Sequence, residues 1–177
     1  MNPGFSIVVD AGDGWGTGAH ETTQLCLQAI AMYAPELASP WRVLDFGSGS
    51  GILSIGAAKL GATVHGVEID ERGIAHAKQN SRMNSVSDRV EFTGELSPLS
   101  TRYEIVVANI LRSVLLGFAE SLCQRLTSQG VLILSGLVST DVPEVSVRYS
   151  SFLNGQMPEV FRRGEWRALV WPRANSR

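Results

Sequence analysis

The sequence is poor in the residues that build disulfide scaffolds and metal centres. It has only two cysteines in 177 residues, Cys26 and Cys123, and each lies in an apolar segment that resembles a helix. Because a free cysteine behaves as a small core hydrophobe, we predict two buried free thiols. Neither these cysteines nor the three histidines have the spacing of metal ligands, so we predict no metal site.

Long hydrophobic runs and an excess of positive charge are also missing. No segment approaches the roughly 18 apolar residues of a membrane span, and the N-terminal residues lack the basic and apolar regions of a signal peptide. The net charge is -2, from 15 basic and 17 acidic residues, so no general attraction to nucleic acids or membranes is indicated. These absences favour a cytoplasmic protein, disfavour a nucleic-acid substrate, and leave enough chain for one well-packed domain.

What is present is an alternation of strand-like and helix-like segments. We expect strands over 41–46, 63–69, 88–94, 103–110 and 131–137, with helices over 51–61, 70–85 and 113–130 between them. A further helix is expected over 20–34, ahead of Pro35, and an antiparallel edge strand over 164–173. This order predicts an α/β fold, with a mostly parallel sheet and helices on both faces.

The first expected strand runs into a loop of small residues. The stretch VLDFGSGSGIL, Val43 to Leu53, places three glycines and two serines between a strand and a helix. Glycines allow close approach of a ligand to the backbone, and the helix that follows offers free N–H groups. Ligands of open α/β sheets bind at the carboxyl ends of the strands, so the loop predicts a nucleotide or cofactor site.

An acidic residue follows the second expected strand. Glu68 lies about 20 residues beyond the loop, where a carboxylate can accept hydrogen bonds from both hydroxyls of a ribose. Asp70 is close by, but its position suits the N-cap of the next helix. We therefore assign the ribose to Glu68.

The loop and Glu68 fit both a nicotinamide oxidoreductase and a methyltransferase. The loop sequence GSGSG lacks the G-x-G-x-x-G spacing that brings a pyrophosphate close, and the chain has no catalytic pattern typical of a dehydrogenase. Asn109 ends the strand IVVAN with a side chain that can both donate and accept a hydrogen bond, so it can hold an amine or a methionine head group. These features favour S-adenosylmethionine over a dinucleotide.

Six segments occur in the order found in the ribosomal protein L11 methyltransferase family. They are WGTGAHETTQLCL, VLDFGSGSGILSIGAAKLGA, GVEIDERGIAHAKQNSRMN, VVANIL, VLILSGL and EWRALV. The chain resembles this family from Trp15 to Trp171. The resemblance implies a class I methyltransferase with a seven-stranded Rossmann-like sheet, an antiparallel C-terminal strand and S-adenosylmethionine as cofactor. It also implies a single catalytic domain over 15–177, preceded by an N-terminal segment over 1–14.

The resemblance also implies roles for individual residues. Trp15, Thr17 and His20 occupy the stretch expected to cover the site. Asn109 and His20 are the catalytic candidates, and Asn109 also faces the methionine end of the cofactor. His20 could also be a plain loop or capping residue, and either His20 or solvent could take the proton of the amine. The full predicted cofactor-binding set is Thr23, Asp45, Gly47, Gly49, Glu68, Ile69 and Asn109.

The sequence departs from the family pattern in three places. Ser48 stands where the family commonly has Cys, and Glu68 stands where it usually has Asp. Family members carry an N-terminal domain that holds the ribosomal protein, whereas only 14 residues precede Trp15 here. If Met1 is the native start, the acceptor is open: an amino group of a protein or a small-molecule amine. Two other hypotheses stay open. The chain could be a non-catalytic cofactor-binding subunit, and a partner chain could supply substrate recognition.

Overall fold

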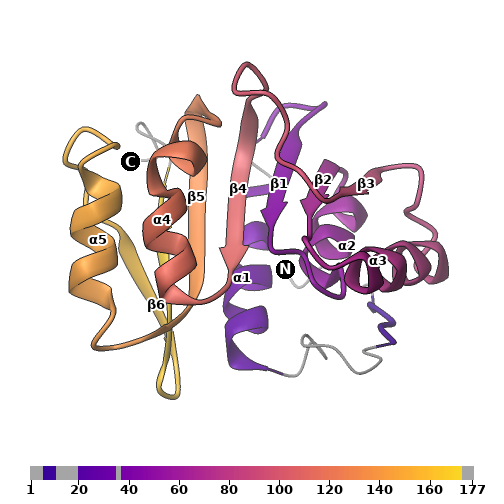
Figure 1. The fold of residues 1–177 in the computed structure, drawn as a ribbon, viewed down its shortest axis with the longest axis horizontal. Coiled ribbons are helices and arrows are strands. Elements are labelled where there is room, and N and C mark those ends of the chain that lie inside the picture. The colour runs from indigo at the N-terminus through magenta and orange to yellow at the C-terminus, as the bar shows by residue number, and fades with distance from the viewer. Residues whose placement is uncertain (1–5, 11–19, 35–36, 173–177) are drawn as a thin grey trace.

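The computed structural model describes residues 6–10, 20–34 and 37–172. They form one seven-stranded sheet in the order β3-β2-β1-β4-β5-β7-β6, with helices on both sides (Figure 1). The elements are α1 Glu21–Tyr33, β1 Arg42–Phe46, α2 Ile52–Lys59, β2 Thr63–Val67, α3 Glu71–Met83, β3 Val90–Thr93, β4 Tyr103–Asn109, α4 Arg112–Cys123, β5 Leu126–Val138, α5 Val142–Ser150, β6 Glu159–Arg163 and β7 Trp166–Trp171.

The sheet reverses its direction of growth at β1. The chain proceeds outward from β1 to β2 and β3, returns to place β4 on the other side of β1, and then continues to β5. These pairings are parallel, whereas β7 runs antiparallel to both of its neighbours. The expected mostly parallel α/β sheet with one antiparallel C-terminal strand is confirmed. The carboxyl ends of β1 and β4 meet at the switch point, where ligands of such sheets bind.

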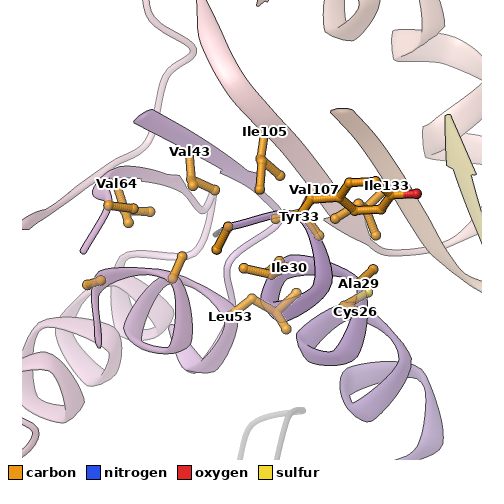
Figure 2. Close-up of a cluster of buried hydrophobic side chains, with 14 of the residues drawn as sticks. Cys26, Ala29, Ile30, Tyr33, Val43, Leu53, Val64, Ile105, Val107 and Ile133 are labelled. Atoms are coloured by element: carbon orange, nitrogen blue, oxygen red, sulfur yellow. The ribbon is translucent and has the colours of Figure 1, made fainter. Parts of the chain in front are cut away.

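Alternate residues of the central strands pack into two separate cores. Val43 and Ile105 face α1 and α2, while their neighbours Leu44 and Val106 face α4 and α5. Figure 2 shows the first core, with Ile30 of α1 and other side chains of α1 and α2 against the strands. A strand that is buried on both faces explains the uninterrupted apolar runs in the sequence.

Both cysteines are buried free thiols, as predicted. Cys26 faces the first core from α1, and Cys123 ends α4. Burial raises the pKa of the Cys26 thiol well above its ordinary value and that of Cys123 to about 12. Both groups are therefore held in the neutral form.

The predicted helix over 113–130 is wrong over 124–130. The helix α4 ends at Cys123, and Leu126 already begins β5. Arg125 stabilises the turn between α4 and β5. Its carbonyl accepts from the Tyr103 N–H, and its guanidinium donates to the carbonyls of Ser121 and Ser97. The apolar periodicity continues through this turn, but the pairing with β4 decides the structure.

The predicted C-terminal strand is present but does not lie at the edge. β7 lies between β5 and β6, and β6 forms the edge of the sheet. Neither β6 nor α5 was expected from the sequence. β6 is exposed over nearly all its length, so it lacks the alternation of apolar residues that marks a half-buried strand. None of the helices within 6–10, 20–34 and 37–172 is long and apolar enough to cross a membrane.

Candidate cofactor and acceptor site

Three residues from three strands form one row at the carboxyl edge of the sheet. Phe46 of β1 pairs with Val67 of β2 and with Ala108 of β4. The residue that follows each of these is Gly47, Glu68 and Asn109 respectively. The three predicted positions, which are far apart in the sequence, therefore lie side by side where the strand order reverses.

The glycine loop is folded back onto β2. The N–H groups of Gly47 and Ser48 both donate to the carbonyl of Val67, at 2.8 and 3.0 Å. Gly47 has a φ of +79°, and a Cβ at this position would lie 2.3 Å from Cγ2 of Ile110. Gly51 has the same φ and is the N-cap of α2. The loop thus needs glycine for its turns and for close packing, and it ends at a helix N-terminus.

Asp45 lies beneath the loop with no exposed surface. Its Oδ2 accepts from the N–H of Ser54 at 3.0 Å and from the Ser54 hydroxyl at 2.6 Å. Burial raises the pKa of the Asp45 carboxyl from 3.8 to about 6, against the opposing effect of the two Ser54 hydrogen bonds. The negative charge of Glu68 adds to the increase. Asp45 therefore connects the end of β1 to the first turns of α2.

The carboxylate of Glu68 connects the loop to the end of β2. Its Oε2 accepts from the Gly49 N–H at 2.9 Å, and its Oε1 accepts from the Asp70 N–H at 3.0 Å. A carboxylate has about four acceptor positions, so two remain for other donors. Ile69, the next residue, is 90% exposed. Asp70 caps α3 by accepting from the Arg72 N–H, so its predicted capping role is confirmed.

Asn109 is held by the first turn of α1. Its Nδ2 donates to Oγ1 of Thr22 at 3.1 Å, and Thr22 Oγ1 lies 2.8 Å from Nδ1 of His20. His20 is the N-cap of α1, and its ring packs edge-to-face on Trp166 of β7, with centroids 4.9 Å apart. Side chains from β4, α1 and β7 thus meet in one chain of contacts.

The structure brings most of the predicted residues to this edge but gives two of them buried positions. Asp45 and Thr23 have almost no exposed surface, whereas His20 and Ile69 are exposed. Trp15 and Thr17 lie outside the described residues. Thr22 was missed because the resemblance indicated only the second of the two successive threonines, Thr23, for which a cofactor contact was predicted. Trp166 was missed because no local signal relates β7 to α1.

A short N-terminal segment, 6–10, is fastened to α3 by two buried asparagines. Asn84 exchanges hydrogen bonds with the N–H and carbonyl of Val8. Asn80 does the same with Asp10, and its Nδ2 also donates to the carbonyl of Ser50 at 2.9 Å. Asn80 therefore connects the glycine loop to the segment that precedes α1, which the sequence had not indicated.

Two buried polar atoms at the loop have no partner among the described residues. They are Oδ1 of Asp45 and the hydroxyl of Ser48. Because buried polar groups are nearly always hydrogen-bonded, an unpaired carboxylate oxygen and hydroxyl at the same loop fit a polar ligand. The part of the chain that the structure describes has no group of His, Cys, Asp and Glu residues able to hold a metal ion.

Two solved structures that share the fold are named as methyl-transferring enzymes. The ribosomal protein L11 methylase of Lactobacillus delbrueckii subsp. bulgaricus superimposes with a TM-score of 0.77 at 29% identity, covering 90% of this chain and 81% of that one. The 16S rRNA N2 G1207 methyltransferase of T. thermophilus, at 22% identity, superimposes with a TM-score of 0.76 over 90% of this chain and 45% of that one. The second likeness shows the fold alone.

Curated relatives are similar over nearly the whole chain. The ribosomal protein L11 methyltransferase of Trichlorobacter lovleyi is 39% identical over 176 residues, which are 94% of this chain and 56% of that protein. That of Syntrophotalea carbinolica is 40% identical over 170 residues, with 93% and 54% covered. The chain thus spans about half the length of the curated relatives it matches. Residues 3–174 match the family model of ribosomal protein L11 methyltransferase (PrmA), and the chain belongs to that family.

Proposed function

We propose that residues 15–177 form an S-adenosylmethionine-dependent N-methyltransferase domain that methylates an amino group of a protein. The observation that carries the proposal is the row of Gly47, Glu68 and Asn109 across β2, β1 and β4. A donor cofactor lying along this row would place its nucleoside beside Glu68 and its reactive end beside Asn109. Family membership supports the same reaction, since the curated relatives are named for it.

The cofactor would be held at both ends by groups that the structure leaves able to bind it. The free acceptor positions of Glu68 suit ribose hydroxyls, and the exposed side chain of Ile69 suits the face of an adenine. Gly47, Gly49 and Ser48 suit the methionine part, which is polar and approaches the backbone closely. Thr23 and Asp45 are buried. We propose that Thr23 holds α1 in place, and that Asp45 holds the glycine loop while its unpaired Oδ1 remains for the ligand.

When bound, S-adenosylmethionine supplies a methyl carbon on a cationic sulfur: the amine lone pair forms the N–C bond as the C–S bond breaks, and the electron pair of that bond returns to sulfur. The protein must hold a neutral amine in line with that carbon. Orientation of this kind provides about 7 to 11 kcal/mol in well-aligned systems. We assign it to Asn109, whose Nδ2 is engaged with Thr22 and whose Oδ1 is left to accept from the amine. Water and the exposed ring of His20 are the two candidate acceptors of the released proton.

The acceptor that we propose is an amino group of a ribosomal protein, because the curated relatives carry that substrate in their names.

Calorimetry with S-adenosylmethionine and with NAD tests the cofactor, and tight binding of NAD alone would overturn the proposal. Incubation with methyl-labelled S-adenosylmethionine, purified ribosomal protein L11 and, separately, a host lysate tests the acceptor. Label in a protein band is the expected result. Label in small molecules only would contradict a protein acceptor.

A further inference from the structure

The hydrogen bonds between His20, Thr22 and Asn109 can be assigned proton by proton. The backbone N–H of Thr22 points at Nδ1 of His20, with N and Nδ1 3.3 Å apart. An N–H group cannot donate to a nitrogen that carries its own proton, so Nδ1 is the unprotonated, accepting nitrogen of the ring. His20 is therefore the tautomer with its proton on Nε2.

The accepting Nδ1 fixes the direction of the next hydrogen bond. Thr22 Oγ1 lies 2.8 Å from Nδ1, and because Nδ1 has no proton, the hydroxyl must donate to it. The only proton of the hydroxyl is then used, and its oxygen can serve Asn109 only as an acceptor. The group of Asn109 that faces Thr22 is thus the amide NH2, as the 3.1 Å contact from Nδ2 has it. The amide oxygen must point away from Thr22.

From this chain of contacts we infer that Thr22 is a positioning residue for Asn109. It selects one of the two orientations of the amide, the one that leaves Oδ1 free among the described residues to accept from the amine. The inference rests on the proposed function, because the orientation matters only if an amine is the acceptor. Thr22 is 4% exposed, so its hydroxyl is shielded from solvent.

The same assignment gives His20 a positioning role instead of a role as the base. Its one unprotonated nitrogen is occupied by Thr22, and Nε2 carries the proton. The neutral ring therefore has no free lone pair for a proton from the amine, and the proton leaves to water. The edge-to-face contact with Trp166 holds the ring in this orientation. His20 then acts as a helix cap that directs the hydroxyl of Thr22.

The first experiment compares Thr22→Val, which removes the hydroxyl at similar volume, with Thr22→Ser, which keeps it. We expect Thr22→Val to lower kcat by about tenfold or more, with KM for the protein acceptor and affinity for S-adenosylhomocysteine changed by less than about threefold. Thr22→Ser should restore most of kcat. Equal kcat values for the two variants, at similar melting temperatures, would overturn the inference.

A double-mutant cycle with Asn109 shows whether Thr22 acts through the amide. In Thr22→Val/Asn109→Ala the loss should equal that of Asn109→Ala alone, because Thr22 has nothing left to orient. Losses that multiply would assign Thr22 a separate function and overturn the inference.

His20→Asn keeps an accepting cap, whereas His20→Ala does not, so kcat should fall less in His20→Asn. The reverse order, or loss of the acidic limb of the pH profile in His20→Asn, would make His20 the base.

A readout without catalysis separates this inference from the proposed function. Nitrogen NMR of the imidazole rings in the wild-type protein should show His20 with its proton on Nε2, and Thr22→Val should change that signal. A ring protonated on Nδ1 would overturn the inference even if methyl transfer is found. A wild-type protein that transfers no methyl group, but shows the expected tautomer, would instead overturn the proposed function.

Discussion

Glu68 and Gly49 are joined across the loop by a hydrogen bond of 2.9 Å from the Gly49 N–H to Oε2 of the carboxylate. The residue predicted to bind the ribose thus also fixes the loop predicted to bind the methionine part. One side chain couples the two halves of the cofactor site, so substitutions of Glu68 should affect both.

Glu68→Ala should weaken binding of S-adenosylmethionine by about 1.5 to 3 kcal/mol, the range for hydrogen bonds to a charged group. Asp70→Ala is the matched control, since Asp70 is a neighbouring exposed acid that caps α3 and does not contact the loop. It should lower stability by about 1 kcal/mol through the lost cap and leave affinity nearly unchanged. Isothermal titration calorimetry measures the affinity of both variants for S-adenosylmethionine. An equal loss of affinity in Asp70→Ala would show that the local charge, and not the position of Glu68, is responsible.

Ile110 lies between two glycines, and the two contacts differ in kind. A Cβ at Gly47 would meet the side-chain Cγ2 of Ile110 at 2.3 Å, whereas a Cβ at Gly136 would meet the backbone oxygen of Ile110 at 2.6 Å. Either alanine substitution should destabilise the protein by more than the roughly 1 to 2 kcal/mol of a left-handed non-glycine residue. Urea unfolding measures the free energy of unfolding of each variant and of the wild type.

Ile110→Ala separates the two cases. It removes Cγ2, so the double variant Gly47→Ala/Ile110→Ala should be more stable than the sum of the single effects predicts. The effects of Gly136→Ala and Ile110→Ala should add, because the backbone oxygen remains. Additivity in both pairs would mean that the loop moves away from Ile110 when Gly47 is replaced.

The features that the sequence predicted are those with a local signal. The turn at Gly47, the cap at Asp70 and the acid at Glu68 each follow from residue type and distance to a strand end, and the fold follows from the alternation of patterns. Thr22 and Trp166 gave no such signal, because their contacts depend on how α1 and β7 lie against β4. The end of α4 at Cys123 was missed for the same reason, since apolar periodicity cannot show where pairing with β4 begins.

Asn80 and Asn84 offer a comparison between two similar anchors. Both hold the segment 6–10, but only Asn80 also donates to the carbonyl of Ser50 in the glycine loop. Each is buried, so replacement by alanine should lower the free energy of unfolding by about 1 to 3 kcal/mol. Only Asn80→Ala should also weaken cofactor binding, measured by calorimetry. Equal affinities in the two variants would show that the loop keeps its conformation without Asn80.

The buried carboxyl of Asp45 should make stability depend on pH in a defined interval. Its pKa is raised by burial from 3.8 to about 6, so between these values the folded state binds a proton that the unfolded state releases. The free energy of unfolding therefore falls as pH rises through this interval. Asp45→Asn cannot ionise, and its amide oxygen can still accept from both groups of Ser54. Its stability relative to wild type should increase by up to about 3 kcal/mol from pH 4 to pH 6, since one pKa unit equals about 1.4 kcal/mol.

Urea unfolding at several pH values measures this difference, and the slope is informative even if Asp45→Asn is less stable at every pH. Asp88→Asn, at an exposed aspartate between α3 and β3, is the control for the loss of one negative charge. The difference between Asp88→Asn and wild type at each pH is subtracted from that of Asp45→Asn, which leaves the effect of the buried carboxyl. If the corrected difference for Asp45→Asn does not change with pH, the Asp45 carboxyl titrates in the folded state as it does in the unfolded chain. The unpaired Oδ1 beneath the loop would then be reached by water and would no longer support a ligand at that position.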